Sequence, residues 1–122
     1  MTEQVAGVRV LIVDAGGPLI TSERDGADLI GDAIGEGADW LAIPVARLSD
    51  DFLTLSTGLA GEILQKAVNY RISVAIVGDI AARVAASKPL NDFVVESNRG
   101  RHVWFVDDLD ALRTRLDLST SS

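Results

Sequence analysis

Four short runs of apolar, largely β-branched residues limit the possible folds more than any other feature of this chain. They occupy residues 8–14, 40–45, 72–78 and 102–106, with more polar stretches between them. Runs of nearly continuous apolarity are typical of strands buried on both faces of a sheet. Strands that alternate with helices are usually joined by crossovers and therefore pair in parallel. The sequence predicts an α/β fold.

The remaining elements follow from helical periodicity and turn signals. Gly16-Gly17-Pro18 predicts a tight turn after the first strand, leading into a short antiparallel strand at 18–21, because so short a connection leaves no room for a crossover helix. Helices are expected at about 23–37, 57–70, 79–86, 89–98 and 109–117, with Ser22 as the cap of the first and Ser49 as the cap of a short turn around Phe52. The predicted order is β-β-α-β-α-β-α-β-α in one mixed, mostly parallel sheet.

Length and composition predict one domain over residues 1–122, ordered from about 7 to 117, with a polar tail at 118–122. Apolar residues make up 48% of the chain, enough for a real core, yet no apolar run approaches the ~20 residues that cross a bilayer. The chain has no cysteine and does not start like a signal peptide. We therefore expect a cytoplasmic protein without membrane association.

Charge narrows the classes of partner. The net charge is −7 and the basic residues form no extended cluster, so we expect no nucleic-acid binding. His102 is the single histidine, which argues against a transition-metal site, whereas oxygen-only binding of Mg²⁺ or Ca²⁺ stays open. No P-loop or dinucleotide fingerprint is present, and we expect no cofactor.

Several short motifs are similar to those of one bacterial family. They are LSTGLAGEILQK at 55–66, NY at 69–70, AIVGD at 75–79, DF at 92–93 and ESNRG at 96–100. Together they resemble the domain-of-unknown-function family 4180, over about residues 8–116. That resemblance implies no established activity.

The predicted order of elements also resembles the STAS domains, which include the anti-sigma-factor antagonists. In those domains a serine at the start of a helix is phosphorylated to control partner binding, and Ser56-Thr57-Gly58 stands at the corresponding place. Leu55 stands where that family has an aspartate. The resemblance implies a STAS-like regulatory module that binds a protein partner.

The turn formed by Ser56, Thr57 and Gly58 is the first candidate site. The free N–H groups and the dipole at a helix N-terminus favour an anion. The alternative is an ordinary helix cap, with a glycine that allows close packing.

Polar residues on the helix that follows are the second candidate. They are Glu62, Lys66, Asn69 and Tyr70. They are expected to line a pocket or to face a partner, or else to form a solvated helix face with one Glu62–Lys66 ion pair.

Aspartates that follow strands, and a polar helix end, complete the candidates. Asp14, Asp79 and Asp107 stand where α/β sheets bind ligands, although helix capping explains each of them as well. The polar helix end contributes Glu96, Asn98 and Arg99.

These observations favour a non-catalytic interaction or regulatory module with an unidentified protein partner, and a homodimer stays open. The alternative is a small enzyme or ligand sensor with a pocket around Lys66, Tyr70, Asp79 and Glu96. The two differ in geometry, because a pocket requires these four groups to converge.

Overall fold

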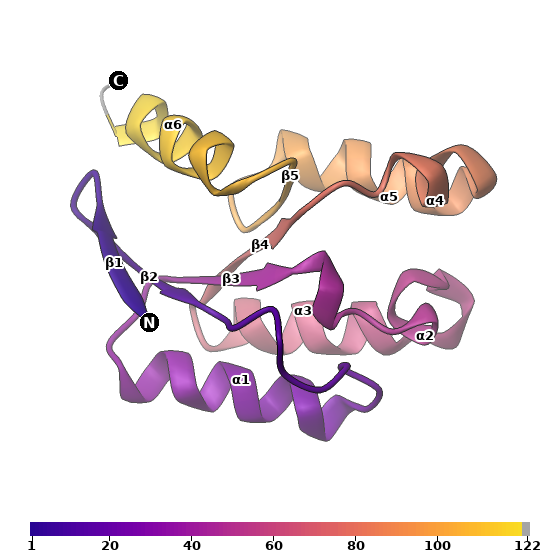
Figure 1. Cartoon of the computed structure of the whole chain (residues 1–122), viewed down its shortest axis with the longest axis horizontal. Coiled ribbons are helices and arrows are strands. Elements are labelled where there is room, and N and C mark those ends of the chain that lie inside the picture. Colours follow the sequence, from indigo (N-terminus) through magenta and orange to yellow (C-terminus); the bar gives the residue numbers. More distant parts are fainter. Residues whose placement is uncertain (121–122) are drawn as a thin grey trace.

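A computed structural model describes residues 1–120 and shows one five-stranded sheet in which the strands lie in chain order, β1-β2-β3-β4-β5 (Figure 1). The first pair is antiparallel and the other three pairs are parallel. The α/β class and the mixed, mostly parallel sheet are therefore confirmed. The strands are β1 (Thr2–Val5), β2 (Val8–Ile12), β3 (Trp40–Pro44), β4 (Ser73–Val77) and β5 (Val103–Val106).

Six α-helices and two short 3₁₀ turns connect and cover the strands. The α-helices are α1 (Glu23–Gly35), α2 (Asp50–Leu53), α3 (Leu59–Asn69), α4 (Ala81–Ala86), α5 (Lys88–Arg99) and α6 (Leu109–Thr120). The 3₁₀ turns are η1 (Val45–Arg47) and η2 (Leu55–Thr57). No helix among residues 1–120 is long and apolar enough to cross a membrane.

The predicted hairpin between 8–14 and 18–21 is wrong. The antiparallel partner of β2 is β1, which precedes it and is joined to it by Ala6 and Gly7. Both turn residues have positive φ, 51° and 83°, which is the pattern of a type I′ turn and matches the twist of a two-stranded ribbon. Residues 18–21 instead bend away, and Ile20 forms a single parallel bridge with Leu48.

One face of the sheet carries most of the core. Leu41 and Ile43 of β3 and Val74 and Ile76 of β4 point to this face, and all four are at most 1% exposed. Helices α1, α3 and α5 pack there, as Leu90 of α5 illustrates. Strands that follow one another in chain order through right-handed crossovers place their connecting helices on the same side, which accounts for this layer.

The opposite face depends on α6. Leu112 and Leu116 of α6 cover a buried pair of indoles, Trp40 from β3 and Trp104 from β5, whose ring centroids lie 4.5 Å apart. Ala75 of β4 lies between these two strands and is fully buried, so its small side chain leaves room for the rings. The helix therefore closes the second core.

The predicted serine caps are confirmed. Ser22 accepts a hydrogen bond from the Asp25 N–H at 3.2 Å, and Ser49 accepts one from the Phe52 N–H at 3.2 Å. Each cap satisfies an N–H group that the first helical turn leaves without an intrahelical partner.

The predicted limits of the ordered region need correction at both ends. Thr2–Val5 forms a strand, so order begins before residue 7. At the other end the expected tail from Leu118 is helical as far as Thr120, and the rest of that tail lies outside the described residues.

The close contact of α1 and α3 gives the first prediction. A Cβ on Gly26 would lie 2.6–2.7 Å from the side chain of buried Ile63, whereas a Cβ on Gly31 of the same helix would meet nothing within 4 Å. Gly26→Ala should lower the free energy of unfolding by about 1 kcal/mol or more, because the core must shift. Gly31→Ala should raise it by ~0.5–1 kcal/mol through helix propensity. Urea denaturation of the two variants measures both, and equal effects would contradict the packing.

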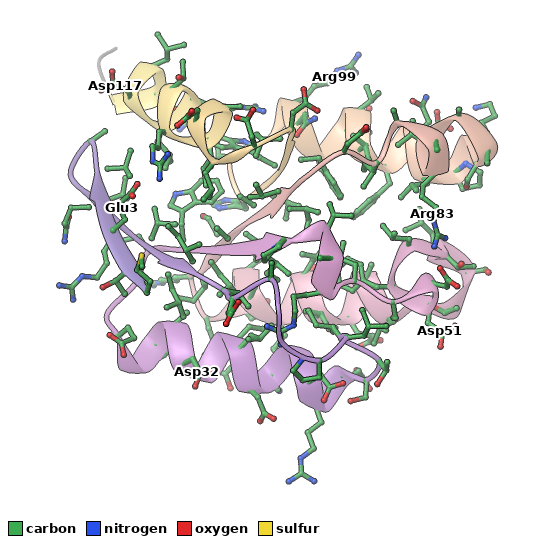
Figure 2. All side chains as sticks on the ribbon, viewed as in Figure 1. Glu3, Asp32, Asp51, Arg83, Arg99 and Asp117 are labelled. Carbon is green, nitrogen blue, oxygen red and sulfur yellow. The ribbon has the colours of Figure 1, made fainter. Side chains whose placement is uncertain are left out.

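The contact between β1 and α6 gives a pH prediction. Arg113 donates two hydrogen bonds to Glu3, at 2.7 and 3.0 Å, and these hold the pKa of Glu3 below its ordinary value (Figure 2). The folded state therefore binds this proton less well than the unfolded state. The resulting stabilisation is present above the ordinary pKa, about 4.3, and is lost as pH falls through the lowered value.

Glu3→Gln should reduce the free energy of unfolding at about pH 6. The difference from wild type should shrink towards about pH 3, at which unpaired glutamates are protonated. Urea denaturation at the two pH values measures the difference. A difference that is the same at both would show that the ion pair contributes nothing.

Candidate functional site

The turn at residues 55–58 lies where the chain passes from α2 into α3, beyond the carboxyl end of β3. Ser56, Thr57 and Gly58 are all exposed. Gly58 has a φ of 79°, which explains why the sequence has glycine at this point. The turn therefore presents two hydroxyl-bearing side chains at the surface.

The two hydroxyls have different surroundings. The Thr57 hydroxyl donates to two carbonyls, that of Asp51 at 2.6 Å and that of Thr54 at 2.9 Å. It also accepts a hydrogen bond from the Leu59 N–H at 3.3 Å. Within residues 1–120, the Ser56 hydroxyl has no hydrogen-bond partner. The hydrogen bonds of Thr57 thus stabilise the turn, and Ser56 is the side chain that is available for an external contact.

An apolar groove adjoins one side of this turn. It has a volume of about 580 Å³, and its apolar lining comes from Leu53 and Leu55 on one wall and Pro89 and Leu90 on the other. Ser56 stands at its edge. Arg83 of α4 reaches across to Asp50 of α2 and forms an ion pair with it, which connects the two walls (Figure 2).

An acidic hollow of about 440 Å³ adjoins the other side of the turn. Three carboxylate side chains line it, those of Glu23 at the start of α1, Asp51 of α2 and Glu62 of α3. Within residues 1–120 none of the three forms an ion pair. Thr57 and Gly58 belong to the same lining, so the turn separates an apolar groove from an acidic hollow.

The rest of the polar face predicted on α3 points to solvent. Lys66, Asn69 and Tyr70 are exposed, and Tyr70 has 55% of its surface exposed. Asn69 accepts a hydrogen bond from Gln65 at 3.0 Å. The expected ion pair between Glu62 and Lys66 does not form within the described chain.

The four residues of the alternative pocket do not all gather in one place. Tyr70 precedes β4 and Asp79 follows it, so they stand at opposite ends of that strand. Glu96 is on α5, exposed, and pairs with Arg99 at 3.3 Å. Asp79 accepts a hydrogen bond from the Ala81 N–H at 2.8 Å, which makes it a local cap. This arrangement gives the enzyme or sensor alternative no geometric support.

Asn98 has a role at the edge of the sheet. It is half-buried, and its side-chain carbonyl accepts a hydrogen bond of 2.7 Å from the Phe105 N–H of edge strand β5. An edge strand with an unpaired N–H is open to unwanted pairing with another chain. Asn98 also lines a cavity of about 230 Å³ together with Asp79 and Asp107.

Arg47 is not among the candidates predicted from the sequence, and it is only 9% exposed. Its Nη1 donates to the Asp14 carbonyl at 2.7 Å and its Nε donates to the Pro18 carbonyl. Gly17 packs against the guanidinium so closely that a Cβ there would lie 2.5 Å from Nη1. A charged residue between Val45 and Leu48, in an otherwise apolar stretch, is the sequence signal that could have identified it.

No group of three or more His, Cys, Asp or Glu side chains in the described chain is arranged to hold a metal ion. The Asp14 side chain accepts a hydrogen bond from the Gly16 N–H at 2.9 Å and so stabilises the turn that follows it.

The fold and this site define a small α/β domain whose candidate surface lies at the carboxyl ends of parallel strands. The family model described as Domain of unknown function (DUF4180) matches residues 5–116. The chain belongs to this family, which confirms the resemblance of its motifs. No curated protein and no solved structure gives a significant match.

The different surroundings of the two hydroxyls give the third prediction. Thr57→Ala removes a hydroxyl that bonds to three backbone groups, so it should lower the free energy of unfolding by about 1 kcal/mol. Ser56→Ala should change it by no more than ~0.5 kcal/mol, as is usual for a surface substitution. Urea denaturation compares them, and a larger loss for Ser56→Ala would reverse the assigned roles.

Proposed function

We propose that this protein is a non-catalytic interaction module whose protein partner binds over the 55–58 turn. The observation that carries the proposal is the position of the turn between an apolar groove, which the exposed Ser56 helps to line, and an acidic hollow, which Thr57 and Gly58 help to line. Interfaces commonly combine a buried apolar anchor with polar contacts around it. The similarity of the element order to STAS domains supports the same kind of function by analogy.

The lining of the two depressions supports a particular chemistry for the proposed partner. The groove between Leu55 and Pro89 suits one apolar side chain, and the hollow with Asp51 and Glu62 suits a lysine or arginine. A net charge of −7 also favours the approach of a basic partner. We therefore expect a partner with an apolar residue next to a basic one.

Ser56 is the residue at which such binding would be regulated. A phosphate there would add about 1.5–2 negative charges and three acceptor oxygens at the edge of the groove. Arg83 lines the same groove and is held by Asp50 on the exposed surface, where an ion pair contributes little stability. A phosphoserine can therefore compete with Asp50 for Arg83 and change the groove wall.

The test replaces Ser56 and a matched residue elsewhere. Ser56→Glu adds charge at the turn, and Thr114→Glu adds the same charge at an exposed position of α6. Each variant is immobilised and used to capture proteins from an extract of the source organism. A partner that the wild type and Thr114→Glu retain equally should bind Ser56→Glu at least about tenfold less. The added carboxylate stands at the apolar groove and must lose water when the apolar side chain of the partner enters, which costs on the order of 1.4 kcal/mol or more.

Both variants must keep the wild-type unfolding midpoint, which thermal denaturation checks. Equal capture by Ser56→Glu and Thr114→Glu would leave the turn a structural cap and refute the proposed surface.

A further inference from the structure

Helix α4 forms a narrow wall between the apolar groove of the proposed partner surface and a second depression of about 230 Å³. Arg83 and Ala86 of α4 line the groove, whereas Ala81 and Val84 of the same helix line the second depression. Figure 1 shows α4 beside α5, which also borders both depressions. Displacement of α4 would therefore join the two spaces.

Helix α5 contributes one continuous strip to these two depressions. Leu90 lines the groove, and Val94, about one helical turn further on, lines the second depression together with Phe105 of β5. Residues four positions apart lie on the same face of a helix, so Leu90 and Val94 are neighbours on α5. Without α4, the groove would extend from Leu55 over Leu90 to Val94 and Phe105.

Few interactions hold α4 in place. None of its six residues is buried, and only Val84 packs part of its surface against the core. A helix in water needs roughly 12–15 residues to be stable without tertiary support, so α4 depends on its contacts. The ion pair between Arg83 and Asp50 joins α4 to α2, but both side chains are largely exposed, at 47% and 82%, where such a pair contributes little stability. Local opening of α4 therefore breaks few favourable contacts.

We propose that α4 is a displaceable cover of the partner groove, held closed by the ion pair between Arg83 and Asp50. This inference rests on the proposed function, because it concerns regulation of the same groove. When α4 moves away, the groove lengthens along α5, and Val94 and Phe105 become additional contacts for the partner. A partner that requires the open form has its apparent affinity reduced by the fraction of molecules that are open. The ion pair therefore limits partner binding.

Native-state hydrogen exchange of the full chain tests the opening without any partner. The Val84 N–H, which donates to the Ile80 carbonyl at 2.9 Å, reports on α4, and the Val74 N–H, which donates to the His102 carbonyl at 2.8 Å, reports on the sheet. Relative to the intrinsic rates, Val84 should exchange at least about a hundredfold faster than Val74. Low concentrations of urea should barely change the exchange of Val84, because local opening exposes little surface.

A matched pair of variants tests the role of the ion pair. Asp50→Asn removes the partner of Arg83 without altering α4, and Glu96→Gln removes the same charge from the exposed pair of Glu96 with Arg99 on α5. Asp50→Asn should speed the exchange of Val84 about two- to fivefold, as expected for the loss of an exposed ion pair, and Glu96→Gln should leave it unchanged. Thermal denaturation verifies that both variants remain folded.

Partner binding then connects the opening to the groove. With the protein that the wild type captures in the test of Ser56, Asp50→Asn should raise the apparent affinity by the same factor by which it speeds the exchange of Val84, since both depend on the open fraction. Glu96→Gln should bind as the wild type does. The increase is expected although Asp50→Asn removes a negative charge that would favour a basic partner.

Two results would overturn the proposal. The first is exchange of Val84 that is as slow as that of Val74, or as steeply dependent on urea, because α4 would then open only in global unfolding. This result would leave the proposed partner surface intact, which is tested separately by Ser56→Glu. The second is faster exchange in Asp50→Asn without stronger partner binding, which would make the opening irrelevant to the groove.

Discussion

The parallel pairing of β2, β3, β4 and β5 in chain order is the constraint on which the rest of the structure depends. Each parallel connection must return to the opposite end of the strands, so β2, β3 and β4 are each followed by a loop at the carboxyl end and then by helical segments. Because the crossovers share one hand, α1, α3 and α5 collect on one face. The other face must be covered by an element that comes after the last strand, and α6 does this over Trp40 and Trp104.

The same constraint brings the loops after β2 and β3 together, and Arg47 and Ser49 connect them. Ser49 donates its hydroxyl to the Ile20 carbonyl at 2.6 Å, and the Ile20 N–H donates to the Arg47 carbonyl at 2.7 Å. These bonds replace the strand pairing that residues 18–21 do not form. They also fix the start of the segment that leads to the 55–58 turn. The proposed partner surface therefore depends on this set of polar contacts.

Burying Arg47 without a carboxylate is costly unless its N–H groups are bonded. Two backbone carbonyls supply such bonds, and the Gly16-Gly17 turn wraps closely enough to bring them into place. The glycines were interpreted from the sequence as the turn of a hairpin. Their role in the structure is to admit a guanidinium, since any side chain at Gly17 would occupy its position.

The sequence by itself determined the features that depend on neighbouring residues. The apolar runs predicted four of the five strands, and helical periodicity predicted α1, α3, α5 and most of α6. Ser22 and Ser49 were predicted as the caps of α1 and α2. All of these signals act over a few residues. The Ser56–Gly58 turn was also visible, although only the structure showed that Thr57 is bonded within it and Ser56 is not. Tertiary structure decided that β1 is the antiparallel partner of β2. The sequence of β1, Thr2–Val5, is polar and weakly patterned, so this segment becomes a strand only because it pairs with β2. It also decided that Arg47 is buried and that Tyr70 and Asp79 lie at opposite ends of β4, because those positions depend on how distant segments pack rather than on local sequence.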